Sequence, residues 1–365
     1  MENYVQSDEI SEEAGAKVFA KYWYQYNWAL IKFLEECESR TSCSLSIECH
    51  EDVLIIDRKE VKDSQVSLYQ VKERSESSNY TAKSLAYSNP NSKSKSVISK
   101  LVSNLDKEHL KGRIARLALV SATPFNISVN NKHPSEKLHS FRWEDIKEED
   151  SEVLLESIKK ELSKEEAPLF IEFIKGVEAK TEVVHSSIAL NSLTSYIEEM
   201  FPQDAYRPKV IFEALRTELI RIGTNTTIYP DWNDFLKFKT ITSEKLNNVI
   251  RRRSITVNGN AIIPLWAKVT EEADLKSLPF VERAQLKTAA TNYCQKRIQC
   301  VNSAHVQLSS EVFQVLENTN LKTFNDYVSY IVDVIASNDE ILFEYFDKDR
   351  TLLKAAVMIE LVECV

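Results

Sequence analysis

The sequence predicts an α/β core followed by a mainly helical domain, and three patterns in the 365-residue chain support this prediction. A helical period uninterrupted by proline runs through residues 12–36. Short alternating or β-branched apolar runs follow within residues 45–72 and recur at 115–121. From residue 151 onward, most segments show the 3.6-residue period of amphipathic helices.

The first element, at residues 12–36, is expected to be one long helix that packs against a sheet. Ser11 precedes Glu12 and Glu13, and a serine before two acidic residues is typical of a helix start. The apolar and aromatic residues recur three or four positions apart, as a buried helix face requires. These residues are Val18, Phe19, Tyr22, Trp23, Tyr26, Ala29, Leu30, Phe33 and Leu34.

A mixed sheet of about four or five strands is expected next, flanked by helices. Residues 45–49 alternate between apolar and polar side chains, and residues 53–56 form a short apolar run rich in β-branched side chains. Residues 65–72 alternate again. After an intervening helix, residues 115–121 have the apolar composition of a buried strand.

The connections and later helices are assigned from composition and period. Residues 75–96 are rich in Ser, Asn and Lys and are expected to form a mobile loop. Residues 130–150 are polar and loop-like, and Asn258-Gly259 is a strong turn signal for a hairpin at 255–263. Helices are expected at 97–110, 153–162, 168–177, 187–201, 210–222, 232–238 and 243–252, and from 282 to the end.

The linker pattern at 201–208 suggests two domains, residues 1–205 and residues 206–365. The chain has 46 Lys and Arg against 55 Asp and Glu, a formal charge of −9, and 43% hydrophobic residues. This composition is that of a soluble globular protein, and the net negative charge argues against constitutive binding of nucleic acid over the whole surface. It leaves room for a local basic groove.

Counts of special residues narrow the function classes further. No apolar stretch is long enough to cross a membrane, and the acidic N-terminus does not resemble a secretory signal, so we expect a cytoplasmic protein. The five glycines are too scattered to form a phosphate-binding loop. The six cysteines contain no C-x-x-C pair and are interpreted as reduced core or incidental thiols.

The residues that point to chemistry lie between 48 and 72. Asp52 stands at the start of one predicted strand, and Gln70 and Lys72 lie on the same face of an adjoining strand. A hairpin would bring Asp52 beside them. Asp52, the amide oxygen of Gln70 and the carbonyl of Val71 could hold Mg²⁺, with Mn²⁺ as the alternative. Lys72 could stabilise charge on a phosphate, whereas the plainer interpretation is a cross-strand charge pair.

Four segments resemble the restriction-endonuclease-like (PD-(D/E)xK) nuclease domain of bacterial antiphage effectors: Ala14-Gly15-Ala16, Tyr24-Gln25, Glu48 to Asp52, and Tyr69 to Lys72. Such domains occur in CBASS effectors and in the Lamassu nuclease subunit. The resemblance implies that Asp52, Gln70 and Lys72 form the catalytic triplet. Gln70 stands where Glu or Asp is usual, which removes one negative charge and should weaken metal binding.

The resemblance also implies a function: metal-dependent cleavage of double-stranded DNA in antiphage defence. It implies gating by an SMC-like ATPase complex, release on detection of DNA, and an active homo-oligomer, with the C-terminal helices as the docking surface. Three alternatives remain open. They are pairing with a HerA-type ATPase, a catalytically inactive helical interaction subunit, and a ribonuclease or structure-specific nuclease.

Several further residues are weaker candidates. Glu12, Glu13 and Gln25 on the first helix are possible helpers, although core packing or capping is the more common role of such residues. His50 could act as a general base, but a single histidine beside a strand is more often a packing or surface residue. Basic residues that could touch phosphates or an acidic partner are Lys93, Lys95, Lys100, Arg251, Arg252 and Arg253.

Overall fold

The computed structural model describes residues 13–40, 42–58, 64–73, 79–89, 94–177, 182–202, 206–251, 262–299 and 303–364. The chain divides into two compact units. The first comprises the chain up to Leu193 together with Leu219–Ser243, and the second comprises Thr194–Glu218 together with Glu244–Val365. The assignment of nuclease function to residues 1–205 and of partner docking to residues 206–365 stays a prediction.

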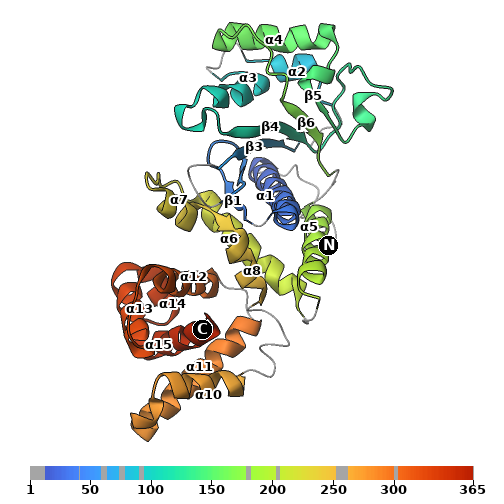
Figure 1. Ribbon diagram of the computed structural model, residues 1–365. Coiled ribbons are helices and arrows are strands. Elements are labelled where there is room, and N and C mark those ends of the chain that lie inside the picture. Colours follow the sequence, from blue (N-terminus) through green and yellow to red (C-terminus); the bar gives the residue numbers. More distant parts are fainter. Residues whose placement is uncertain are drawn as a thin grey trace, which may run out of the picture. The chain divides into compact units, whose positions relative to one another are not determined.

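The first unit is built on a seven-stranded mixed sheet in the order β5-β6-β4-β3-β2-β1-β7 (Figure 1). Strands β7, β1, β2 and β3 pair antiparallel, β3, β4 and β6 pair parallel, and β5 closes the far edge antiparallel. The mixed α/β sheet is therefore confirmed, with more strands than expected. The bounds are β1 Ser44–Ile47, β2 Val53–Ile56, β3 Val66–Lys72, β4 Ile114–Ser121, β5 Ser140–Arg142, β6 Glu172–Lys175 and β7 Ile241–Thr242.

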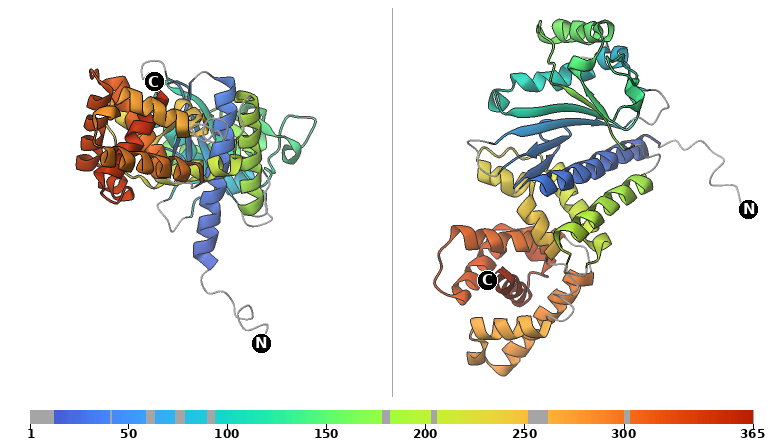
Figure 2. Two further views of the ribbon diagram at one scale, coloured as in Figure 1. Left: turned by 90° about the horizontal axis from the view of Figure 1, so that it is seen from below. Right: turned by 45° about the vertical axis from the view of Figure 1, so that its right-hand side comes forward.

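Helices cover both faces of this sheet. Helix α1 (Glu13–Ser39) lies along one face with α5 (Glu182–Met200) beside it, where the rings of Tyr24 and His185 stack 4.3 Å apart (Figure 2). The other face carries α2 (Ala82–Ala86), α3 (Val97–Val102) and α4 (Glu148–Leu162). Apolar residues of these helices and of β2, β3 and β4 form one continuous buried core on that side.

The sequence-based assignments were wrong in four places in this unit. Within the expected mobile loop at 75–96, residues 82–86 form helix α2, which Thr81 caps by accepting a hydrogen bond from the backbone N–H of Ser84. Residues 168–177, expected to be helical, contain β6, because Ile171 and Phe173 alternate into the core and the backbone pairs with β4. The expected loop at 130–150 contains β5 and the start of α4. The expected helix at 97–110 ends at Val102 and continues as two 3₁₀ turns, η1 (Ser103–Asp106) and η2 (Glu108–Leu110).

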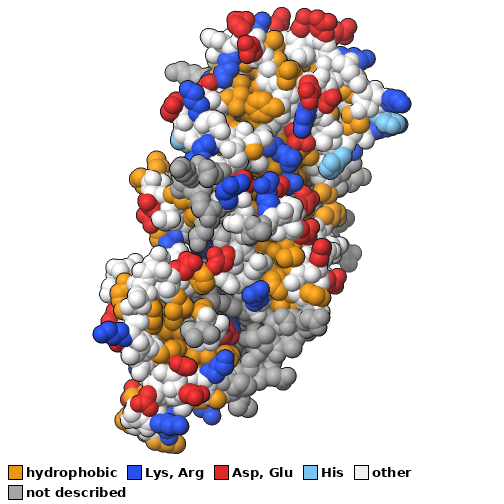
Figure 3. All heavy atoms as spheres, viewed as in Figure 1, with side chains coloured by type: hydrophobic (Ala, Val, Ile, Leu, Met, Phe, Trp, Pro, Cys, Tyr) orange, Lys and Arg blue, Asp and Glu red, His pale blue; other side chains and the backbone are white. Residues whose placement is uncertain are grey.

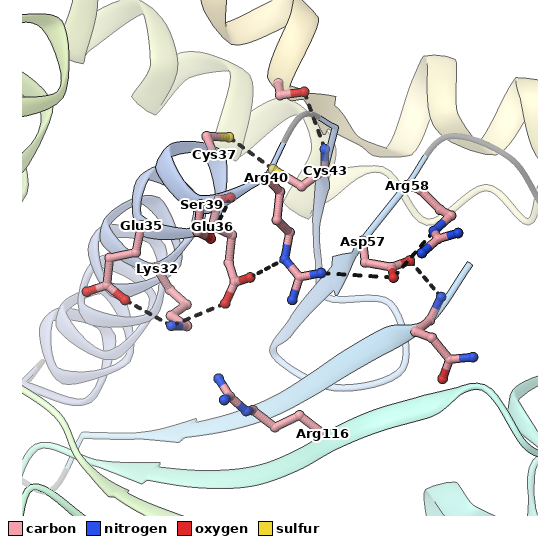
Figure 4. A network of polar contacts seen from close by, with 12 residues as sticks. Lys32, Glu35, Glu36, Cys37, Ser39, Arg40, Cys43, Asp57, Arg58 and Arg116 are labelled. Atoms are coloured by element: carbon pink, nitrogen blue, oxygen red, sulfur yellow. Dashed lines mark hydrogen bonds and ion pairs between the residues drawn. The ribbon is translucent and has the colours of Figure 1, made fainter. Parts of the chain in front are cut away.

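A chain of ionic contacts ties the C-terminal end of α1 to the sheet (Figure 4). Glu36 accepts a hydrogen bond of 2.7 Å from Arg40 and lies 3.3 Å from the ammonium of Lys32. Arg40 in turn lies 3.9 Å from Asp57, which accepts a 2.7 Å bond from the backbone N–H of Gln65. Burial alone would raise the pKa of Glu36, but the two cations outweigh it and lower that pKa. The contacts fix α1 at the sheet end opposite Asp52, since Asp52 precedes β2 and Asp57 follows it.

The described cysteines are free thiols, as the sequence predicts. Cys37, at the end of α1, and Cys43, before β1, are both buried, and their sulfurs lie 3.0 Å apart (Figure 4). Cys294 is buried in the second unit, whereas Cys49 and Cys364 are half-buried. Within the described residues these side chains fill core positions.

The second unit is helical, which confirms the predicted helical C-terminal region. Its central element is α15 (Arg350–Cys364), which is buried almost continuously from Leu353 to Val362 among its neighbours. Residues 255–261 of the expected hairpin lie outside the described residues, and Ile262 and Ile263 begin a helix. The other described helices of this unit are α8 Ser243–Arg251, α10 Ile262–Glu272, α11 Phe280–Gln299, α12 Ser303–Asn318, α13 Phe324–Asn338 and α14 Glu340–Tyr345. Helix α6 (Pro208–Thr224) runs from the second unit into the first, and α7 (Trp232–Lys239) belongs to the first. None of the described helices is long and apolar enough to span a membrane.

Candidate active site

The loop between β1 and β2, residues 48–52, carries the predicted carboxylate. The backbone N–H of Glu48 donates a 3.1 Å hydrogen bond to the carbonyl of Asp52, which closes the loop. Glu48 adopts a left-handed conformation with φ 51°, which is unfavourable for a residue with a side chain. Such strain is tolerated where surrounding contacts fix the backbone, and it is common near functional sites.

Strand register brings Asp52 to the two predicted partners on β3. The last ladder pair of β2 and β3 is Val53 with Tyr69, so the next step places Asp52 opposite Gln70. Oδ2 of Asp52 accepts hydrogen bonds from the side-chain amide of Gln70 and, at 2.8 Å, from the backbone N–H of Val71. The ammonium of Lys72 lies 3.9 Å from the same oxygen. The structure thus brings all three predicted catalytic residues together where the inner strand β2 begins and β3 ends.

Helix α1 adds Gln25 to this group. Its amide nitrogen donates a 3.2 Å hydrogen bond to the carbonyl of Val71. Its amide oxygen is buried and has no hydrogen-bond partner among the described residues. A buried oxygen without a partner costs free energy, and a cation beside it would relieve that cost.

Burial raises the pKa of all three carboxyl groups in and around the loop. For Asp52, burial outweighs the opposing effects of Lys72, the Val71 N–H and Gln70, so its pKa lies above the ordinary value. Burial and the neighbouring Asp52 raise the pKa of Glu48. Burial raises the pKa of Glu51 to about 7, although the side chain of Asn104 donates a hydrogen bond to it. An apolar setting thus holds several acids together, as at many catalytic sites.

Three cationic or imidazole side chains surround the loop from other elements. Lys107 donates a 3.3 Å hydrogen bond to the carbonyl of His50, and the imidazoles of His50 and His109 meet at 3.2 Å between their Nε2 atoms. Burial lowers the pKa of His50 to about 4, with smaller effects from Lys107 and His109. Lys239 is also buried, and its ammonium donates to the carbonyls of Ile222 and Asn225 at 2.6 and 2.7 Å.

A comparison with known families agrees with this geometry. The model of the Cap4 dsDNA endonuclease domain matches residues 13–223, which is more than half of the chain. The chain belongs to the Cap4 dsDNA endonuclease family. It therefore carries a DNA endonuclease domain of antiphage defence, as found in CBASS systems. No curated protein and no solved structure matches the chain.

The oxygen ligands available in this Cap4-family domain suit a hard divalent cation, although few of them are negatively charged. Among the described residues, no three His, Cys, Asp or Glu side chains are placed to hold a metal together. Asp52 is thus the one predicted carboxylate ligand, and the other oxygens come from amides: the side chain of Gln70, the Val71 carbonyl and the unpartnered Gln25 oxygen. Mg²⁺ commonly takes one or two carboxylates and completes its shell with water and substrate phosphate.

The weaker sequence candidates have mixed outcomes. Gln25 and His50 lie at the site, whereas Glu12 is outside the described residues and nothing is described of the side chain of Glu13. Lys93, Arg252 and Arg253 are likewise outside the described residues. The sequence analysis missed four residues that contact or face the loop: Asn104, Lys107, His109 and Lys239. No local motif marks them, because each reaches the loop only through tertiary packing.

Replacing Glu51 with Gln should stabilise the first unit at alkaline pH. The folded pKa of about 7 exceeds the ordinary value of 4.5, so wild-type stability falls as pH rises between these values. Above pH 7 the carboxylate is ionised and its burial lowers the free energy of unfolding by the full amount. Glu51→Gln should therefore raise the free energy of unfolding by about 2–3 kcal/mol at this pH. Urea unfolding in EDTA at pH 8 and pH 4.5 measures this difference, which should nearly vanish at pH 4.5.

Glu156 is exposed, so Glu156→Gln is the matched control for Glu51→Gln. It should leave the free energy of unfolding unchanged at both pH values. The charge change of His50 between these pH values affects wild type and variant alike and cancels in the comparison. Equal stability of wild type and Glu51→Gln at pH 8 would show that Glu51 is not buried as an anion.

Proposed function

We propose that this protein cleaves double-stranded DNA in a reaction that depends on Mg²⁺, with Mn²⁺ as a substitute. The observation that carries the proposal is the convergence of Asp52, Gln70 and Lys72 where β2 begins and β3 ends. Asp52, the Gln70 amide oxygen and the Val71 carbonyl would hold the ion, and the Gln25 oxygen would assist, since the amide of Gln25 already binds the Val71 carbonyl. A bound ion of this kind activates water and neutralises charge on the phosphate.

The protein's own residues have separate roles in this proposal. The Val71 N–H and the Gln70 amide orient the Asp52 carboxylate by binding the same oxygen. Gln70 now presents its amide nitrogen, so metal binding requires the amide to turn and present its oxygen. Lys72, about one-third exposed, can approach a phosphate oxygen and stabilise its developing charge.

The surface charge supports local rather than extended contact with DNA. The whole chain carries a formal charge of −9. On the face shown in Figure 3, Lys and Arg side chains are interspersed with Asp and Glu side chains. Affinity for the DNA backbone grows with the number of phosphates that basic side chains neutralise. Such a surface suits a nuclease that needs a partner or a second copy to hold DNA.

Cleavage of supercoiled plasmid tests metal dependence directly. Purified protein should produce nicked and linear DNA in Mg²⁺ or Mn²⁺ and none in EDTA. Equal cleavage in EDTA would refute a metal-dependent site at Asp52. Parallel reactions with single-stranded DNA and RNA test the structure-specific and ribonuclease alternatives. If the proposal holds, double-stranded DNA should be cleaved faster than either of these substrates.

We further propose that an SMC-like ATPase complex gates the nuclease, as in Lamassu systems, and that release leads to an active homo-oligomer. The helical second unit supports this, because it exposes apolar residues such as Phe280 and Val281 at 75% and 65%. Exposed apolar pairs are common at protein interfaces. A HerA-type ATPase is the alternative partner.

Co-expression with each candidate ATPase distinguishes these partners. The SMC-like complex should co-purify with the full chain and suppress cleavage until DNA and ATP are added. Co-purification with the HerA-type ATPase alone would replace the Lamassu-like assignment and leave the nuclease proposal intact. Light scattering of the released protein then reports whether it oligomerises.

A further inference from the structure

The two imidazoles beside the catalytic loop meet nitrogen to nitrogen. His50 lies within the loop at residues 48–52, and His109 lies in η2. Their Nε2 atoms are 3.2 Å apart, while their ring centres are 4.6 Å apart and the ring planes are tilted by 38°. The nitrogens are therefore closer together than the rings that carry them.

These distances distinguish two ways in which imidazoles can meet. A head-on N–H···N hydrogen bond at this nitrogen separation would place the ring centres about 5.5 Å apart. Two imidazoles that bind one ion at about 2.05 Å with their nitrogens 3.2 Å apart make an angle of about 103° at the ion and place their ring centres about 5.0 Å apart. The observed ring separation of 4.6 Å is about 0.4 Å below the shared-ion value and about 0.9 Å below the head-on value, so the rings converge more as they do around one ion than as in a head-on bond.

From this geometry we propose that His50 and His109 form a two-histidine site for a divalent transition-metal ion such as Zn²⁺. Imidazole nitrogen suits Zn²⁺, Ni²⁺ and Cu²⁺, whereas Mg²⁺ prefers oxygen, so the site is chemically distinct from the one at Asp52. To bind through Nε2, each ring carries its proton on Nδ1. Water or a DNA phosphate fills the remaining positions.

The surroundings limit the affinity of this site. Lys107 donates to the backbone carbonyl of His50 and places a positive charge nearby, and the described residues add no third His, Cys, Asp or Glu ligand. We therefore expect micromolar rather than nanomolar binding of Zn²⁺. Binding at such a site responds to changes in the available metal concentration.

Binding of Zn²⁺ to His50 and His109 should affect catalysis, an expectation that rests on the proposed nuclease function. His50 is two residues before Asp52, and His109 belongs to a separate element that follows α3. An ion bound by both fixes the loop to η2 and adds positive charge near the proposed Mg²⁺ ligands. Zn²⁺ at this site should therefore slow Mg²⁺-dependent cleavage.

The test uses the full-length protein without an affinity tag and Zn²⁺ alone as the probe. Calorimetric titration in the absence of DNA should show one Zn²⁺ bound to wild type, together with a higher Tm. The variant His109→Gln retains hydrogen-bonding capacity but lacks an imidazole, and it should lose more than about tenfold in affinity. The exposed residue His133 supplies the control His133→Ala, which should bind as wild type does.

The outcomes separate this proposal from the nuclease proposal. Unchanged Zn²⁺ affinity in His109→Gln, or no binding to wild type, would overturn the two-histidine site whatever the cleavage activity. Where cleavage is measurable, Zn²⁺ should inhibit wild type and leave His109→Gln largely uninhibited. Equal inhibition of both would locate the effect at the Asp52 site and overturn the regulatory consequence.

Discussion

Lys72→Ala should lower the rate of DNA cleavage by about 10²–10³-fold, because it removes the ammonium group that lies 3.9 Å from the Asp52 carboxylate. The side chain is about one-third exposed, so its removal creates little cavity in the core. The variant should fold with a slightly lower Tm at neutral pH, because Lys72 partly compensates the buried charge of Asp52. The measurement is plasmid cleavage in Mg²⁺ under single-turnover conditions, alongside a thermal unfolding curve.

Lys83→Ala is the matched control for Lys72→Ala, because Lys83 is an exposed lysine on α2 of the same unit. It should cleave DNA at the wild-type rate. If Lys72→Ala cleaved equally well, the catalytic lysine would lie elsewhere. If wild type itself never cleaved after release from its partner, the alternative of an inactive interaction subunit would gain support.

Asp52→Asn should complement that result by losing activity while gaining stability. Burial raises the folded pKa of Asp52 above its ordinary value, so the ionised side chain lowers the stability of the fold at neutral pH. Asn removes that charge and keeps an oxygen that can accept the bond from the Val71 N–H. A higher Tm with no cleavage would separate loss of function from misfolding, as expected where function costs stability. A lower Tm would contradict the sign of this argument.

Arg297→Leu should destabilise the second unit by about 3–5 kcal/mol. Arg297 is almost completely buried, and its guanidinium binds Glu360 at 2.8 Å and forms a two-bond fork with Glu363 at 2.6 and 2.5 Å. Glu360 is fully buried and also accepts bonds from Tyr293 and Ser309, each of 2.5 Å. Without Arg297, this carboxylate would remain in the core without its counter-ion.

The double variant Arg297→Leu with Glu360→Met tests the cause of that loss. Replacing both partners removes the uncompensated charge, so most of the lost stability should return. Urea unfolding followed by circular dichroism should show the change in the transition of the helical unit, and the other transition should remain in place. A cost below about 1 kcal/mol for Arg297→Leu alone would mean that water solvates Glu360 in the folded state.

The sequence could predict the central part of the site because that part is local. Asp52, Gln70 and Lys72 lie on two strands joined by one hairpin, and the two-residue period of a strand fixes which side chains share a face. The first helix, the strands β1 to β4 and the helical C-terminal region follow from the same short-range periods. Short apolar runs remained ambiguous, and the strand at residues 172–175 was therefore mistaken for a helix.

Contacts between distant parts of the chain were decided by tertiary structure alone. Lys239 reaches the loop side of the sheet because β7 pairs with β1, almost two hundred residues earlier in the chain. Asn104 and His109 reach the loop because the chain after α3 breaks into 3₁₀ turns. The sequence determined which chemical groups the hairpin presents, since strand period and hairpin topology are local. Only the packed fold determined which oxygens stay buried, how far each pKa moves, and which two imidazoles meet, since these depend on burial and register between remote segments.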